Sequence, residues 1–422
     1  MTWTNVEAGL EESQDTAIAT LVWGISGSPV GVSLITTPTD DSDRAAELDF
    51  TTTVGGAGAY TVVGGNAGYG PEDGRIAVQT AVVNLDVLPD TGKEVELFSR
   101  IGTSTPYKAE GWRIQDDGSL DLYDKDGTTV LASTSGAALA ANTTARVTVV
   151  WDWLSCDDLY CVVFFGDTVV FEDFVTFSSA PGATVWVVGC RRPASDAARG
   201  CKLRVIHRVF AISTTTTDAP DQTGIPKFLC EAQLPAGDGG VTDWNQDSSA
   251  AGTFDGTYTE WDEAGANDGN TSYNHTAAIA KQRSTGEART ATRIGAADTV
   301  YSSNVYLAHR NAVVSKWDAG GHEFLQELSG TERATAGIGD PGSVYIGNHS
   351  GFSATRPAGG AWAPADLDTV EFGASLTIVD GSTWRVSKVG QIWVYSTAAH
   401  PTSTAIVCPA AGGTTRSFGV IF

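Results

Sequence analysis

Residues 146–177 read RVTVVWDWLSCDDLYCVVFFGDTVVFEDFVTF. The stretch contains three runs with the length and the β-branched, aromatic composition of strands, at 146–153, 160–165 and 169–174. Trp151 and Trp153 stand two positions apart, so in a strand both side chains point to one face, which we predict to be the core face of a sandwich. No helix-length periodic segment separates the runs, so they predict an antiparallel meander and not a βαβ unit.

Similar runs continue on both sides of this stretch. Before residue 213 they are 48–54, 95–101, 112–115, 120–123, 184–188 and 203–212, and after residue 224 they are 227–232, 300–307, 344–346, 370–378, 383–386 and 391–395. Turns such as Asp116-Asp117-Gly118 separate some of them, because Gly accepts positive φ. With 48 Gly, eight Lys and one Met, the composition is not that of a helical protein. We therefore predict an all-β chain of two tandem antiparallel β-sandwich, jelly-roll-like domains.

The chain has 422 residues, too many for one small domain. Residues 213–226 begin with Ser213 and four Thr and lack apolar anchors, which predicts a linker. The expected division is a first domain at 1–212, a linker at 213–226, a second domain at 227–396 and a terminal segment at 397–422. The terminal segment is either a docked strand or a partner-binding arm, and the sequence leaves both open.

The charge excludes some classes of partner. The 26 Lys and Arg against 50 Asp and Glu give a net charge of −24, which would repel nucleic acid and anionic membranes. The most apolar region, 147–177, is interrupted by six acidic residues, so we expect no membrane insertion. No basic residue and no apolar stretch precede Glu11, so we also expect no signal peptide.

One resemblance covers residues 95–212. A strand with Trp112-Arg113-Ile114 is followed by the turn Asp117-Gly118-Ser119-Leu120, the long apolar strand 147–153 and a hairpin around Gly166-Asp167. This order resembles the laminin-G or concanavalin-like jelly roll, although that family's late hairpin turns on Asp-Gly and here the two are inverted. The resemblance implies a jelly-roll sandwich for the first domain.

A second resemblance covers about 260–396 and rests on two blocks in order. Asn267-Asp268-Gly269-Asn270-Thr271-Ser272-Tyr273 is an acidic-glycine turn leading into Thr-x-Tyr, and the later block runs from Trp362 through Asp366 and Val370 to Gly373. Together they are similar to β-rich structural proteins of tailed phages, with Ala363 where Thr is expected. The resemblance implies a virion protein made in the host cytoplasm, and it implies no reaction.

That resemblance leads to the principal functional hypothesis: a non-enzymatic structural protein on the virion surface, serving as head decoration, short fibre or tail appendage. The expected partners are other capsid or tail proteins, copies of itself, with a trimer expected from common virion symmetry, and a host-surface glycan in a role of host attachment. The alternatives are a lectin-like module that recognises host glycans and, less favoured, a polysaccharide-degrading enzyme.

Candidate catalytic residues are weak. Glu260 and Asp262 would lie side by side on one face of a strand, as paired carboxylates for glycan hydrolysis must. Jelly-roll glucanases have Glu-x-Asp-x-x-Glu, whereas this chain has Gly265 at the last position, so we interpret the run as a solvated acidic loop. No Gly-x-Ser-x-Gly is present, and no catalytic residue is predicted.

Metal and cofactor signals are equally weak. The acidic loops Asp40-Asp41-Ser42-Asp43, Asp124-Lys125-Asp126-Gly127 and 267–270 would suit calcium, but none has a distal bidentate Glu and Asx turns explain each. The six His have no partners at metal-ligand spacing. We therefore predict neither a metal nor a cofactor.

The cysteines carry one prediction. Cys190 and Cys201 bracket a basic, turn-like loop between two predicted strands, so a disulfide across the base of the hairpin is expected. Such a bridge would stabilise the fold by about 3 kcal/mol if unstrained. Cys156 and Cys161 flank a second turn and form a weaker candidate pair. The competing interpretation is burial of free thiols as small apolar side chains.

Overall fold

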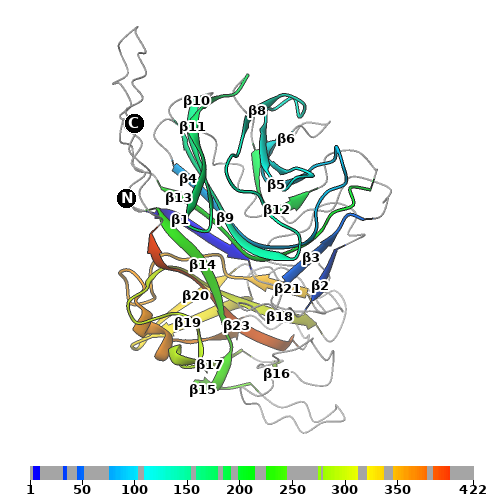
Figure 1. The fold of residues 1–422 in the computed structure, drawn as a ribbon. Helices are drawn as coiled ribbons and strands as arrows, with labels where there is room; N and C mark the ends of the chain where they lie inside the picture. The colour runs from blue at the N-terminus through cyan, green and yellow to red at the C-terminus, as the bar shows by residue number, and fades with distance from the viewer. Residues whose placement is uncertain are drawn as a thin grey trace.

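The computed structural model contains antiparallel strands and two short 3-10 helices in the part of the chain that it describes (Figure 1). The described residues are 3–9, 32–35, 45–51, 76–102, 109–153, 158–178, 184–191, 198–213, 225–244, 274–276, 279–311, 321–336, 346–377 and 384–399. The predicted fold class, all-β with antiparallel sandwiches, is confirmed.

The first half of the chain forms two sheets. The larger has the order β11-β10-β9-β4-β13-β3-β2, with β1 also paired to β13. Its strands are β1 (Trp3–Gly9), β2 (Val32–Ile35), β3 (Ala45–Asp49), β4 (Ile76–Val87), β9 (Thr143–Trp153), β10 (Asp158–Phe165), β11 (Thr168–Thr176) and β13 (Lys202–Ser213). The smaller sheet has the order β12-β5-β6-β7-β8. It is formed by β5 (Val95–Gly102), β6 (Ala109–Ile114), β7 (Leu120–Tyr123), β8 (Val130–Ser133) and β12 (Thr184–Arg191).

The second half forms two further five-stranded sheets. One has the order β14-β23-β18-β21, with β16 paired to β23, and the other has the order β15-β17-β22-β19-β20. The strands are β14 (Pro226–Gln233), β15 (Pro235–Thr242), β16 (Asn274–Thr276), β17 (Ala280–Gly286), β18 (Thr299–Asn311), β19 (His322–Leu328), β20 (Thr331–Ala336), β21 (Ile346–His349), β22 (Glu371–Leu376) and β23 (Trp384–Ala399). The 3-10 helices are η3 (Arg289–Ala291) and η4 (Pro364–Asp368).

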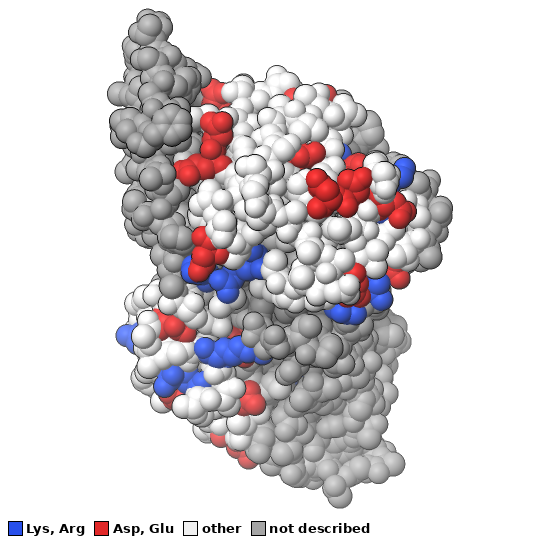
Figure 2. Space-filling view, viewed as in Figure 1, with Lys and Arg blue, Asp and Glu red and all other residues white. Residues whose placement is uncertain are grey.

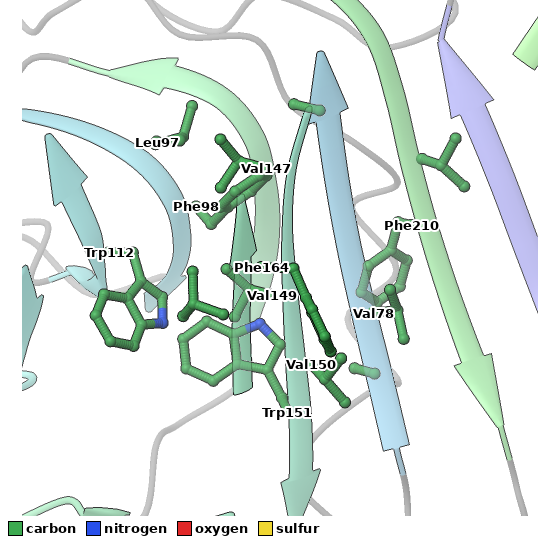
Figure 3. Packing of buried hydrophobic residues seen from close by; sticks show 14 of the residues in the cluster. Val78, Leu97, Phe98, Trp112, Val147, Val149, Val150, Trp151, Phe164 and Phe210 are labelled. Carbon is green, nitrogen blue, oxygen red and sulfur yellow. The ribbon is translucent and has the colours of Figure 1, made fainter. Parts of the chain in front are cut away.

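Aromatic residues fill the space between the two sheets of the first half. Trp151 and Trp153 are buried and their rings stack at 6.5 Å, so the predicted core face is confirmed. Figure 3 shows Trp112 of β6 beside Trp151 of β9 in this layer. Trp112 also packs edge to face against Phe171 of β11, with ring centroids 5.2 Å apart. This contact joins the smaller sheet to β11 at the edge of the larger sheet.

The larger sheet is buried on both faces. Val149 and Trp151 lie on the face toward the smaller sheet, while the register places Val78, Val150 and Val162 on the opposite face, and all are buried. The same apolar cluster continues into the second half through a further set of residues: Phe228, Cys230, Tyr306, Ile392 and Val394. Figure 1 shows the second pair of sheets lying directly beneath β1 and β13. Burial of both faces explains why these strands read as almost continuous apolar runs.

Several predicted strands differ from those observed. The strands predicted at 383–386 and 391–395 are one long strand, β23, and β4, β15, β17, β19 and β20 were not predicted. The expected linker at 213–226 falls mostly outside the described residues, as do the expected N-terminal start and residues 400–422. The predicted domain boundaries therefore stay predictions.

Candidate functional site

The outward face of the smaller sheet carries a row of charged side chains across its strands. Glu96 of β5 lies opposite Arg113 of β6, and Arg113 lies opposite Asp121 of β7. The alternating positions Val95, Ile114 and Leu120 point into the core, so this face is the one turned away from the larger sheet.

Arg113 is the centre of this row. Its Nη1 lies 3.6 Å from a Glu94 carboxylate oxygen, and its Nη2 lies 3.7 Å from a Glu96 oxygen. Nη1 also donates a hydrogen bond to the Gly127 carbonyl at 3.1 Å, which fastens the turn between β7 and β8. Arg199 extends the row, because its Nη1 lies 3.5 Å from the second oxygen of Glu94. Two carboxylates are thus held on one guanidinium.

Tyr123 lies against the same guanidinium. The Arg113 Cζ stands 3.8 Å from the centre of the Tyr123 ring, within the range of a cation–π contact. Burial raises the pKa of the Tyr123 phenol, and the charge of Glu94 raises it further, while Arg113 lowers it. The phenol therefore stays protonated at neutral pH and can donate a hydrogen bond. Tyr123 is half-buried, so it lies at the rim of the site.

A glycine brings β5 and β6 close together beside Tyr123. Gly111 stands between Ser99 and Tyr123 in the register, and a Cβ at this position would lie 2.2 Å from the Phe98 carbonyl oxygen. The position therefore excludes any larger residue. Ser99 is buried next to it, and its Oγ makes no hydrogen bond within the described part of the chain.

The turn Asp124–Gly127, considered above for calcium, is an Asx turn here. Asp126 accepts hydrogen bonds from the N–H groups of Thr128 and Thr129, both at 2.8 Å, and from the Thr129 hydroxyl at 2.6 Å. These bonds hold the pKa of Asp126 well below its usual range. Across the described ranges, no three His, Cys, Asp or Glu side chains gather closely enough to hold a metal ion.

The row on the smaller sheet is the best candidate site because its charges are buried at some energetic cost. Arg113 and Glu96 are 4% and 2% exposed, and desolvating such groups is repaid incompletely by their mutual attraction. Groups with perturbed pKa values cluster at functional sites, and Tyr123, whose pKa is raised, lies against this row. Figure 2 shows acidic side chains gathered on the part of the molecule formed by the first two sheets, with few Lys or Arg among them.

The other predicted residues lie elsewhere. Residues 260–263 and 267–270 fall outside the described residues. Cys201 is buried, and nothing is described of the Cys190 side chain, so the predicted bridge between them stays a prediction. Cys161 is likewise buried, while Cys156 is outside the described residues.

Two histidines are buried in the second half. The Nδ1 of His309 accepts a hydrogen bond from the Trp384 indole N–H at 2.9 Å, and its Nε2 lies 2.8 Å from Asn348 Nδ2. The ring of His322 packs edge-on against Trp384 at 4.3 Å. Both rings pack in the interior of the second half, away from the row on the smaller sheet.

The chain was also compared with known proteins. No protein-family model matches it, and no curated protein matches it. Among solved structures it is similar to endo-β-1,4-glucuronan lyase of the fungus Trichoderma reesei, at 14% identity and a TM-score of 0.35, over 51% of this chain and 98% of that one. It is similar to a carbohydrate esterase of the Shiga toxin-encoding bacteriophage phi24B, at 11% identity and a TM-score of 0.37, over 50% and 99% of the two chains. An alginate lyase of Aplysia kurodai follows at 12% identity and a TM-score of 0.36, over 50% and 99%.

These neighbours contradict the prediction that the chain is not an enzyme. That prediction rested on the resemblance to phage structural proteins and on the absence of catalytic motifs, whereas the solved structures named above include two lyases and an esterase. The physical reason is that an antiparallel sheet brings together residues far apart in the sequence, so a site can form without a motif. In the part of the chain that is described, no helix has the length and hydropathy to cross a bilayer.

Glu94, Glu96 and Tyr123 were not among the predicted site residues. The sequence held one signal for such a site, namely a charged residue inside a predicted strand. Glu96 lies within the predicted strand 95–101, and Arg113 lies within the predicted strand 112–115. Alternation places such residues opposite the core face. Which of them would meet depends on the register between strands, and the residues themselves do not specify it.

Proposed function

We propose that the chain is a carbohydrate-active protein carried on the surface of a tailed-phage particle, and that the outward face of the smaller sheet holds the glycan. The observation that carries the proposal is the arrangement of Glu94 and Glu96 on one guanidinium, beside the half-buried ring of Tyr123. Carboxylates accept hydrogen bonds from sugar hydroxyls, and an aromatic ring packs on the apolar face of a pyranose.

The same groups can support cleavage. Because Glu94 and Glu96 contact one guanidinium, their carboxylates lie no more than about 10 Å apart, which reaches the roughly 5–9.5 Å used by paired carboxylates in glycoside hydrolysis. The protonated phenol of Tyr123 supplies a hydrogen-bond donor at the rim. In this arrangement the protonated phenol of Tyr123 is the available acid, and a carboxylate is the available base or nucleophile.

The location on a phage particle is supported by the second half of the sequence. The block from Trp362 to Gly373, which is similar to tailed-phage structural proteins, forms a compact unit: Trp362 is buried and its indole N–H donates to the Ser353 carbonyl at 2.9 Å. We propose that the protein is a surface appendage or decoration, self-associating as a trimer, with other virion proteins as partners and host attachment as its role. Antibody labelling of imaged particles tests the location.

Glycan activity is tested with the purified full chain and a panel of bacterial surface polysaccharides. Binding and release of new sugar ends are measured for the unchanged chain, Glu94→Gln and Tyr123→Phe, with Asp243→Asn as a control because Asp243 is exposed in the second half. We expect release that falls at least tenfold in the first two variants and is unchanged in the control. Binding without release would favour the lectin-like alternative, and absence of both would contradict the proposal.

A further inference from the structure

We infer that the site on the smaller sheet accepts glycans that lack acidic groups and rejects those that carry carboxylate, sulfate or phosphate. The inference rests on the proposed function and concerns which class of glycan the same face takes. It follows from the pairing of Arg113 with two carboxylates and from the acidic residues that surround this pair.

The cation at the centre of the site already faces two carboxylates of the chain itself. Both terminal nitrogens of Arg113 face carboxylates, Nη1 toward Glu94 at 3.6 Å and Nη2 toward Glu96 at 3.7 Å. Nη1 also donates to the Gly127 carbonyl, and Cζ lies 3.8 Å from the centre of the Tyr123 ring. A guanidinium binds the carboxylate of an acidic sugar most strongly when its donor fork is free to form two parallel hydrogen bonds. This guanidinium would have to give up an existing carboxylate partner to bind one.

The second cation of the row is engaged in the same way. Arg199 Nη1 lies 3.5 Å from the other oxygen of Glu94, so this carboxylate bridges two guanidinium groups. Arg199 is buried, whereas the Glu94 side chain is 20% exposed. A ligand approaching from solvent therefore meets the carboxylate before it meets either cation.

The surrounding strands add negative charge. Residues 90–126, which span β5, β6 and β7 with their turns, contain nine acidic and five basic residues, a net charge of −4. Asp121 is half-buried in the row itself, and the turns contribute Asp117 and Asp126, both exposed. Figure 2 shows the acidic character of this part of the surface. Coulomb repulsion from these carboxylates disfavours the binding of an anionic polymer, and salt screens this repulsion.

Uncharged sugars suit the same groups. Every hydroxyl of a neutral sugar can donate a hydrogen bond to a carboxylate oxygen of Glu94 or Asp121, and such charge-assisted bonds are strong. The Tyr123 hydroxyl can donate to a ring or hydroxyl oxygen in return. Recognition therefore needs no cation beyond those already paired.

The test compares polysaccharides that differ in charge alone. Acidic polymers, namely pectate, alginate, hyaluronan and uronate-containing bacterial capsules, are each paired with their carboxyl-reduced derivative, in which every uronate has become the corresponding neutral sugar. Binding to the full chain is measured by affinity electrophoresis and calorimetry at 50 mM and 500 mM salt. We expect the reduced member of every bound pair to bind at least tenfold more tightly at low salt, with a smaller ratio at high salt.

Two variants localise the effect. Glu94→Gln should reduce the ratio of the affinity for the reduced polymer to the affinity for the acidic polymer. Asp243→Asn changes the net charge by the same amount but lies in the second half, so it should leave this ratio of affinities unchanged. Acidic polymers that bind as tightly as their reduced partners would overturn the inference while leaving glycan binding intact. Absence of binding to every polymer in the panel would instead contradict the proposed function, and the inference with it.

Discussion

At the scale of single residues, the most informative position is Arg113. It is nearly inaccessible to solvent, yet it lies on the face of the sheet that points away from the apolar core. Apolar residues in place of Arg113 and of its carboxylate partners would avoid the desolvation of all these charged groups. Retaining charges in such a place is expected where a ligand uses them, and this is the physical reason for locating the site here.

Ala363 supplies the first prediction. It precedes η4 with φ −123° and ψ 152°, the extended geometry of an N-cap, and makes no side-chain capping bond. Ala363→Thr should place a hydroxyl oxygen where it can accept a hydrogen bond from a backbone N–H in the first turn of η4. This bond should raise the free energy of unfolding by about 0.5–1 kcal/mol. Urea unfolding measures this. Ala365→Thr, an exposed change within the same short helix, is the control, and an equal gain there would contradict the capping explanation.

The buried histidines supply a pH prediction. Burial lowers the pKa of His309 to about 3, and burial together with His309 lowers that of His322 to about 3. Both rings are neutral in the fold, whereas the unfolded chain protonates them near pH 6.5. The unfolded state therefore binds more protons between pH 6.5 and 3, and stability present above pH 6.5 is lost as the pH falls through this window.

Each of these histidines contributes up to about 1.4 kcal/mol per pH unit to that slope. The free energy of unfolding, measured in urea at pH 7, 6 and 5, should therefore fall with acidification. His322→Gln should reduce the slope between pH 6 and 5, because one of the two buried sites is gone. The same slope in both proteins would show that His322 is not held neutral by the fold.

At the scale of strands, sequence patterns predicted those with one apolar face or dense β-branched composition. The predicted 120–123 coincides with β7, and 95–101 with β5 to within one residue. β4 was missed although ten of its residues are buried, because the buried polar residues Gln79, Thr80 and Asn84 interrupt its apolar run. β15 and β17 were missed because Gly, Ser, Lys and Arg dominate them. The candidate site needed the pairing of strands, which short patterns do not specify.

A glycine on β22 gives the prediction at this scale. Gly373 ends the block similar to phage proteins, and a Cβ there would lie 2.0 Å from the Gln282 carbonyl oxygen of β17. Gly373→Ala should therefore disturb the β17–β22 pairing and lower the free energy of unfolding by about 2–3 kcal/mol. Gly240→Ala is the control, because its Cβ would meet nothing closer than 3.6 Å. Equal stability of the two variants would contradict the observed register.

At the scale of the whole molecule, the two halves share one apolar cluster. Phe228 and Ile392 of the second half belong to the cluster that fills the first. Lys227 also pairs with Asp167, in the turn between β10 and β11, at 2.5 Å. Because apolar residues of both halves pack in one cluster, we expect the two halves to unfold together.

Phe228→Ala tests this coupling. Replacing a buried Phe by Ala lowers the free energy of unfolding by about 3–5 kcal/mol. We expect this loss of stability in both halves. Native-state hydrogen exchange of β9 in the first half and β18 in the second reports the two separately. We expect the protection of both strands to fall by the same amount, with one calorimetric transition. Loss confined to β18, or two separate transitions, would contradict a shared core.

The central claim is that the outward face of β5, β6 and β7 binds the glycan. Hydrogen exchange of the full chain, with and without a polysaccharide that it binds, tests this most directly, because bound sugar shields the strands that it covers. We predict slower exchange in Val95–Gly102, Ala109–Ile114 and Leu120–Tyr123, and weaker protection of these strands in Glu94→Gln at the same polysaccharide concentration. Protection confined to β17, β19 and β22 in the second half, with these three strands unchanged, would contradict the claim.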